Sequence, residues 1–417
     1  MFASPSRLDL CFVLKPKMGG NMRTIMSHRH FPPLPIVIDY YCSQRYAVKT
    51  KDMGRMLAAL KRSDRVRGIN LKGSTATLNK FFEAAIFPFP KLESLSLCDQ
   101  DRQELKIPAT FLMGSDLRLQ TLKLHHISLP SIARLLSPAP ALTNLYLVFH
   151  TPPVILHLIS HLRSMPCLRH LKLERRGLIG HAEQPTKPHE NFPLSKLTSF
   201  HYCGSSSFLN SLVGMFAAPS LREVDIHLED GPSPLMYLPR FIDDIGERYR
   251  AVQVTFECRY LRFSFFTHSE YVGHHPPHFT LRTFYFDESI MQMTIAFSAK
   301  LSTTEELLVV FSLPEPEGDI LPWHDFLLYF PNVKTLRMYG TNNSRITRVL
   351  QQDLGGPNLD FLPILEEIEL CRHPSFSPEI LASDLASFRP FISAREQVGL
   401  QVKVVGSDRS LRDGLCR

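Results

Sequence analysis

The stretch Leu92-Glu-Ser-Leu95-Ser-Leu97 decides the fold, because its spacing of apolar residues recurs along almost the whole chain. Each copy has an apolar residue, two other residues, a second apolar residue, one other residue and a third apolar residue. A phrase that returns at a regular interval predicts a repeat architecture before local propensities are considered. The other copies begin at Val66, Leu119, Leu142, Leu168, Leu197, Leu221, Leu281, Val333 and Leu365.

The interval between copies indicates the kind of repeat. From Ile69 to Val224, the middle apolar residues recur at roughly the 20–29 residue spacing of leucine-rich repeats. The two longer intervals, before and after Phe284, each fit two repeats. They predict additional strands at Val252–Phe256 and Leu307–Phe311. The last two apolar residues of each copy alternate with polar residues, which is the periodicity of a strand.

The segments between these strands have apolar residues at helical spacing. In six copies a proline stands two residues before the first apolar residue, where it favours a sharp helix-to-strand junction. Helices are therefore expected at Met53–Leu60, Leu78–Ile86, Ser131–Leu136, Val154–Leu162, Phe208–Phe216, Phe241–Tyr249 and Phe326–Phe330.

One strand and one helix per repeat predict an α/β leucine-rich-repeat solenoid. We expect a right-handed strand–helix horseshoe with a parallel sheet on its concave face, because parallel crossovers are almost always right-handed. The solenoid should span residues 31–405, with a first strand at Leu34–Tyr40 and a last one at Val402–Val405. Residues 1–30 should be irregular and residues 406–417 a disordered tail. The core ladder should contain Leu95, Leu122, Leu145, Leu171, Val224, Leu336 and Ile368.

Composition limits the classes of function. The chain has 44% hydrophobic residues, a net charge of +7 and no block of Lys or Arg, which argues against a nucleic-acid partner. No apolar run is long enough to span a membrane, so no membrane partner is expected. The 8 cysteines are well separated and lack a C-x-x-C motif, which indicates reduced thiols in the cytoplasm or nucleus.

Five passages resemble a large fungal family of F-box/leucine-rich-repeat-like proteins. The resemblance implies a substrate receptor of a ubiquitin ligase, in which an F-box ahead of the repeats recruits the ligase adaptor. Residues 1–30 contain no recognisable F-box helices, so a truncated gene model and a diverged stand-alone receptor both stay open. The passages are FPPLPIVIDYY (31–41), LAALKRSDRVRGINL (57–71), FPFPKLESLSL (87–97), LPWHDFLLYFPNVKTLRM (321–338) and LDFLPILEEIELC (359–371).

Strand residues between the buried positions should face outward on the concave side and bind a protein. Basic residues dominate the early strands and acidic residues the later ones, which fits either a polarised groove for a dipolar partner or solvated strand positions with unrelated charges. The expected binding residues are Lys72, Lys123, His125, Tyr146, His170, Lys172, His201, Glu223, Asp225, Tyr285, Asp287, Arg337, Tyr339 and Glu369.

One column of this face could carry chemistry. Glu174, Cys203 and His227 are expected on three consecutive strands, where a thiol beside an imidazole could be a nucleophile or a metal ligand. Their order is not that of a catalytic triad, so we interpret them as unrelated surface residues. The segment His274-His275-Pro-Pro-His278 is interpreted as a polar loop, and Trp323 as a residue packed at a helix start.

The sequence thus predicts a non-enzymatic binding protein, with no catalytic residue, cofactor or metal. Two alternatives stay open: a scaffold or inhibitor with no ligase link, and a Cys/His hydrolase or metal protein.

Overall fold

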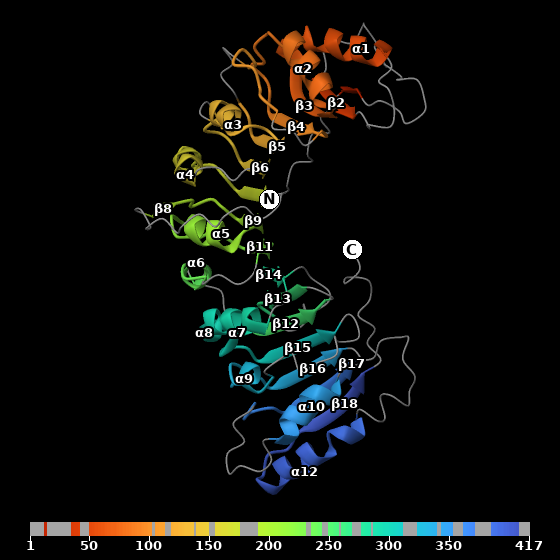
Figure 1. The fold of residues 1–417 in the computed structure, drawn as a ribbon, viewed down its shortest axis with the longest axis vertical. Coiled ribbons are helices and arrows are strands. Elements are labelled where there is room, and N and C mark those ends of the chain that lie inside the picture. The colour runs from red at the N-terminus through yellow and green to blue at the C-terminus, as the bar shows by residue number, and fades with distance from the viewer. Residues whose placement is uncertain are drawn as a thin grey trace, which may run out of the picture. The chain divides into compact units, whose positions relative to one another are not determined.

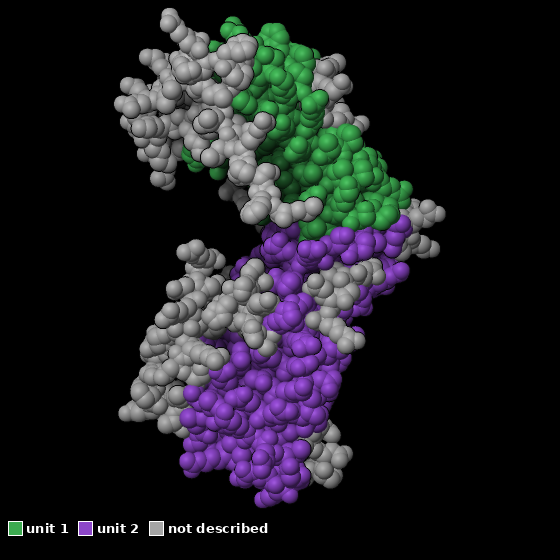
Figure 2. Space-filling view, turned by 180° about the vertical axis from the view of Figure 1, so that it is seen from behind, with its two compact units in different colours: residues 1–178, 192–198 green, residues 179–191, 199–417 purple. Residues whose placement is uncertain are grey.

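The chain forms two compact units, one of residues Met1–Leu178 with Phe192–Thr198 and one of residues Ile179–Asn191 with Ser199–Arg417 (Figure 2). They are called unit 1 and unit 2. Each is α/β, with a mostly parallel sheet and interspersed helices (Figure 1). The computed structural model describes residues 12–14, 35–41, 50–101, 105–112, 118–136, 139–149, 155–175, 191–230, 235–243, 249–257, 260–268, 277–284, 287–311, 323–339, 343–352, 362–371 and 385–407.

Among the described residues, the main sheet of unit 1 has seven parallel strands that follow one another in chain order. They are β1 (Phe12–Leu14), β2 (Ile36–Tyr41), β3 (Val66–Gly73), β4 (Ser94–Asp99), β5 (Thr121–His125), β6 (Asn144–Phe149) and β7 (His170–Arg175). The other elements are α1 (Thr50–Leu60), η1 (Ser63–Arg65), α2 (Thr75–Ala84), α3 (Leu129–Leu136), α4 (Ile155–Arg163) and β8 (Phe192–Pro193).

The repeated leucines form the core of unit 1. Leu95 pairs in register with Leu122, Leu122 with Leu145, and Leu145 with Leu171. These four side chains are at most 1% exposed. Burying a leucine side chain contributes about 1.5–3 kcal/mol, so the ladder is a main source of stability. The prediction of a buried, aligned ladder is confirmed here.

In the described part of unit 2 there are a nine-stranded sheet and a short separate strand. The sheet contains β9 (Ser199–Gly204), β11 (Glu223–Leu228), β14 (Phe279–Phe284), β13 (Tyr260–Phe266), β12 (Ala251–Phe256), β15 (Glu306–Phe311), β16 (Thr335–Tyr339), β17 (Glu367–Cys371) and β18 (Lys403–Ser407), in that spatial order. The other elements are β10 (Phe216–Ala217), α5 (Ser206–Val213), α6 (Leu238–Asp243), α7 (Asp287–Ala296), α8 (Ser298–Leu301), α9 (Trp323–Leu327), α10 (Asn343–Gln352) and α12 (Arg389–Gln397).

The order of β14, β13 and β12 corrects the prediction of an uninterrupted ladder. Strand β11 pairs with β14, and β13 is antiparallel to both of its neighbours. The cause is a tight hairpin after β12. Two backbone hydrogen bonds close it. The Glu257 amide donates to the Tyr260 carbonyl at 2.9 Å, and the Tyr260 amide donates to the Glu257 carbonyl at 3.4 Å. Strands β12, β13 and β14 follow one another in the chain, but their spatial order in the sheet, counted from β11, is the reverse. Val224 aligns with Phe279, so taking Phe284 as the repeat marker was wrong.

Strands β12 and β15 are buried on both faces, because all of their residues are buried. The run Leu307–Phe311 is apolar at every position, as expected of a strand covered on both sides. A small cluster forms on the second face from Ala251, Phe266, Leu308, Val310 and Tyr339. These two strands therefore lack the alternation of buried and exposed residues that the other repeat strands were expected to have.

Aspartates anchor two helix N-termini. The backbone amide of Ser206, at the start of α5, donates to Asp230 Oδ1 at 2.7 Å. In unit 1 the Thr75 amide, at the start of α2, donates to Asp101 Oδ2 at 2.9 Å. An acceptor there satisfies an amide that has no partner within the helix. The turn after β11 is thereby fixed to α5, and this turn contains Glu229.

Several predictions fall at the edges of the described residues. Within the segment expected to be irregular, residues Phe12–Leu14 form β1 and pair with Ile36–Ile38. The remainder of residues 1–30, residues 408–417, and His274 and His275 lie outside the described residues. Trp323 is buried at the start of α9, as predicted. Among the described helices, none is both long and apolar enough to cross a membrane.

Candidate functional site

The sheet face of unit 1 shows the alternation expected of a surface open on one side. Buried leucines alternate with part-exposed polar residues along β4 and β5. Lys72 Nζ lies 5.1 Å from the ring centroid of Tyr41, and Lys123 Nζ lies 4.7 Å from that of Tyr146. A lysine over an aromatic ring is held in place by cation–π attraction and keeps donors for a ligand.

The charges on this face differ in how they are balanced. Lys172 Nζ contacts Glu174 Oε1 at 2.7 Å on the same strand, β7. Lys72 and Lys123 have no carboxylate partner among the described residues. The predicted binding residues His125 on β5 and His170 on β7 also lie on strands of this face, His125 half-buried and His170 exposed.

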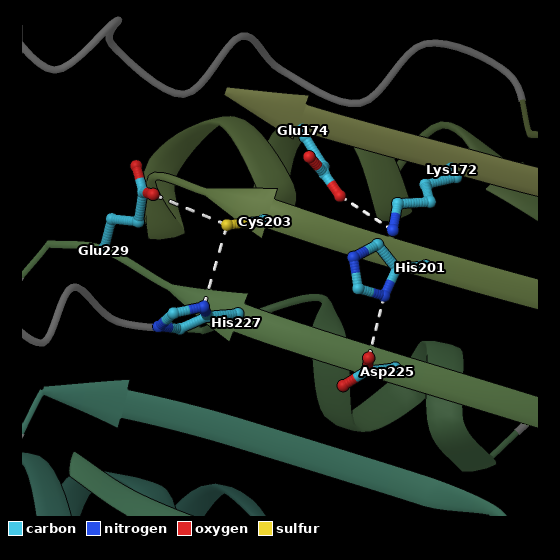
Figure 3. A network of polar contacts seen from close by, with 7 residues as sticks. All are labelled: Lys172, Glu174, His201, Cys203, Asp225, His227 and Glu229. Carbon is cyan, nitrogen blue, oxygen red and sulfur yellow. Dashed lines mark hydrogen bonds and ion pairs between the residues drawn. The ribbon is translucent and has the colours of Figure 1, made fainter. Parts of the chain in front are cut away.

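Two polar pairs join β9 and β11 in unit 2 (Figure 3). His201 Nδ1 lies 2.8 Å from Asp225 Oδ2. Cys203 Sγ lies 3.7 Å from His227 Nδ1 and 3.4 Å from Glu229 Oε1. The parallel register places His201 beside Asp225 and Cys203 beside His227.

The contacts of Cys203 with His227 and Glu229 do not favour a thiolate. Burial lowers the pKa of His227, and the nearby Arg282 guanidinium lowers it further, so this imidazole is neutral at pH 7. A thiolate needs a cation or strong donors, whereas Cys203 faces a neutral ring and the Glu229 carboxylate. The arrangement is that of a protonated thiol donating to Glu229.

One pair of the predicted thiol column is confirmed. Cys203 and His227 are neighbours in register, as predicted. Glu174 contacts Lys172 in unit 1, and a carboxylate that contacts Cys203 is Glu229, which sequence reasoning missed. No group of three or more His, Cys, Asp or Glu suited to a metal occurs among the described residues.

The later acidic residues are largely balanced within unit 2. Arg337 on β16 contacts Glu306 Oε1 at 2.6 Å and Glu369 Oε2 at 2.7 Å. Glu306 is 6% and Glu369 13% exposed, so the guanidinium is held between two poorly hydrated carboxylates. Glu223, at the start of β11, is exposed.

Two predicted binding residues lie elsewhere and one is not described. Asp287 is the first residue of α7 and not a strand residue, because β14 is in a different register from the one predicted. Tyr339 is 9% exposed and packs in the small cluster on β12, β13, β15 and β16. Tyr285 lies outside the described residues.

Sequence reasoning also missed a second cluster, from β13, β14 and the β12–β13 hairpin. Arg262 and Arg282 lie directly opposite each other on antiparallel strands. Both contact Glu257: Arg262 Nη2 reaches Oε1, and Arg282 Nη2 reaches Oε2 at 2.6 Å. The Arg282 guanidinium stacks 4.2 Å from the ring centroid of Tyr260. The alternation of Leu261, Phe263 and Phe265 with polar residues was the available signal for this strand.

Comparison with known proteins adds no identification. The sequence matches no protein-family model and no curated protein.

Proposed function

We propose that this chain is a non-enzymatic protein-binding protein, a leucine-rich-repeat solenoid that holds its partner on the polar face of its sheet. The observation that carries the proposal is the register of unit 1. There Ile69, Leu95, Leu122, Leu145 and Leu171 align as a buried ladder, and polar residues alternate with them. Such a ladder presents a broad, regular surface suited to a protein partner.

The resemblance of the repeat passages supports a narrower role, recognition of a substrate for an F-box-type ubiquitin ligase in the cytoplasm or nucleus. A scaffold or inhibitor with the same sheet face is the alternative. Adaptor binding separates the two. We expect this chain alone not to capture the ligase adaptor, because residues 1–30 carry no F-box signature. Adaptor capture that is lost when residues 1–30 are deleted would contradict this expectation.

The binding face is tested by charge reversal after affinity purification of a protein partner. Lys123→Glu changes a lysine that has no carboxylate partner among the described residues, and should slow association. Lys172→Glu should do the same, less strongly, because Glu174 already balances that charge. The matched control is Lys80→Glu, which changes an exposed residue of α2. Equal effects of the Lys123 and Lys80 reversals would end the assignment of this face.

The salt dependence of association is a second readout. Exposed charges are screened within about 10 Å at 0.1 M salt, so an electrostatic contribution should fall as salt is raised. Lys123→Glu should flatten this dependence, and Lys80→Glu should leave it unchanged.

A further inference from the structure

Two arginines on the sheet of unit 2 share a single carboxylate. Arg262 and Arg282 face each other across β13 and β14, and both contact Glu257. Each guanidinium has five N–H donors, and Glu257 engages only a few of them. Among the described residues no second carboxylate contacts either arginine. The cluster therefore keeps one positive charge and several donors that are not matched.

A third arginine on this sheet, Arg337, has the opposite balance of charges. Arg337 is contacted by two carboxylates, Glu306 and Glu369. One guanidinium between two carboxylates needs no outside anion, so Arg337 serves the sheet itself. Two guanidiniums around one carboxylate have a residual cost, because like charges directly opposite on neighbouring strands repel. A bound anion would remove this cost.

The surroundings of the two arginines fit a planar oxyanion. The Arg262 and Arg282 side chains are 29% and 31% exposed, so a ligand can reach them while much of the water is excluded. Tyr260 stacks on Arg282 and meets the ring of His227 edge-on, at 5.4 Å between centroids. Stacking fixes the plane of the guanidinium, and a fixed fork is what bidentate binding of a carboxylate requires.

We propose that Arg262 and Arg282 form a carboxylate-binding site on unit 2, which takes an acidic side chain of the protein partner. The residual charge is a single positive one, so a monoanion completes the balance, whereas a dianionic phosphoryl group exceeds it. The site extends the proposed function, on which its biological use rests. It also names a chemical feature of the partner, an exposed Glu or Asp.

The test uses a fluorescein-labelled Gly/Ser peptide with several glutamates, measured by anisotropy at physiological salt. The same peptide with glutamines is the uncharged control. The glutamate peptide should bind, and Arg282→Gln and Arg262→Gln should each weaken binding about tenfold or more, the usual effect of losing a hydrogen bond between charged groups. Arg337→Gln removes the same charge from the same sheet and should change peptide affinity less than twofold.

Each alternative result is decisive. A phosphoserine peptide that binds more tightly through the same arginines would overturn the carboxylate assignment. Single-stranded DNA that displaces the peptide by binding the same arginines would overturn the claim that the ligand is a protein. Loss of binding in Arg337→Gln equal to that in Arg282→Gln would reduce the effect to net charge. If Arg282→Gln does not fold, Arg262→Gln tests the same site from the opposite strand. In Arg262→Gln the Glu257 carboxylate still contacts Arg282.

The site and the proposed function fail separately. Arginine-dependent binding of the peptide, with no protein partner captured, supports the site and removes the proposed function. A captured partner whose affinity is unchanged by Arg262→Gln and Arg282→Gln keeps the proposed function and removes the site.

Discussion

The reversed order of strands in unit 2 can be tested by disulfide cross-linking. Asp225 on β11 lies beside Thr280 on β14, and along the same row Thr280 lies beside Ser264 and Ser264 beside Gln253. Neighbouring strands are about 4.8 Å apart, so Asp225 and Gln253 are about 14 Å apart. A disulfide requires Cα atoms within roughly 7 Å. The pair Asp225→Cys with Thr280→Cys should therefore close, and Asp225→Cys with Gln253→Cys should not.

The stability change follows from the length of the closed loop. A bond between positions 225 and 280 encloses about 55 residues, which corresponds to up to about 4 kcal/mol of stabilisation in the chain-entropy model. Losing Asp225 costs little, because its contact with His201 is half exposed and surface ion pairs contribute about 0–1 kcal/mol. The oxidised protein should thus unfold at a higher urea concentration than the same protein after reduction.

The assay is oxidation in a Cys203→Ser background, because Cys203 lies on β9 beside β11. Mass spectrometry of the digested protein identifies the joined peptides, and urea unfolding with and without reductant gives the stability difference. A disulfide joining 225 to 253, with 225 and 280 left as thiols, would refute the reversed order and restore the uninterrupted ladder.

Three further outcomes are expected. Leu145→Ala should destabilise unit 1 by about 2–5 kcal/mol in urea unfolding, because Leu145 is 0% exposed, whereas Leu156→Ala, at a position 43% exposed, should cost far less. The folded-state pKa of His227 is below that of the unfolded chain, so the unfolded state binds the proton first. The contribution of His227 to the free energy of unfolding should then be fully present above about pH 6.5 and decrease as pH falls toward the folded pKa. The variant His227→Gln should lessen this decrease. An unchanged pH profile would contradict the burial argument. Cys203 should react with a thiol probe at an ordinary rate and bring no stoichiometric zinc, and fast labelling abolished by His227→Ala would favour the enzyme alternative.

The sequence predicted unit 1 well because its signals are local. Each leucine phrase specifies one strand, each apolar helical segment one helix, and neighbouring strands in the chain pair in space. The positions of Leu95, Leu122, Leu145 and Leu171 in one buried ladder needed only the period. The open face then followed from the two-residue alternation of a strand.

Unit 2 was predicted less well because its sheet order depends on non-local pairing. The segment from Leu281 imitates the repeated phrase, yet the residue that aligns with Val224 is Phe279 and not Phe284, a shift of 284 − 279 = 5 residues. That difference moved Asp287 from the sheet to α7. The hairpin at Glu257–Tyr260 begins the reversed spatial order of three strands. It lacks a turn sequence such as Asn-Gly, which would have predicted it.

The missed arginines follow from the same reversal. In an uninterrupted parallel ladder each row joins equivalent positions of successive repeats, so a row can be read from the period. The antiparallel β13 breaks this rule and places Arg262 opposite Arg282, with His227 next in the row. Two guanidiniums from outside the repeat thereby face one carboxylate. Where the repeat period fails, a repeat protein can bring together a row of side chains that no single repeat specifies. Such departures from local rules are expected at functional sites.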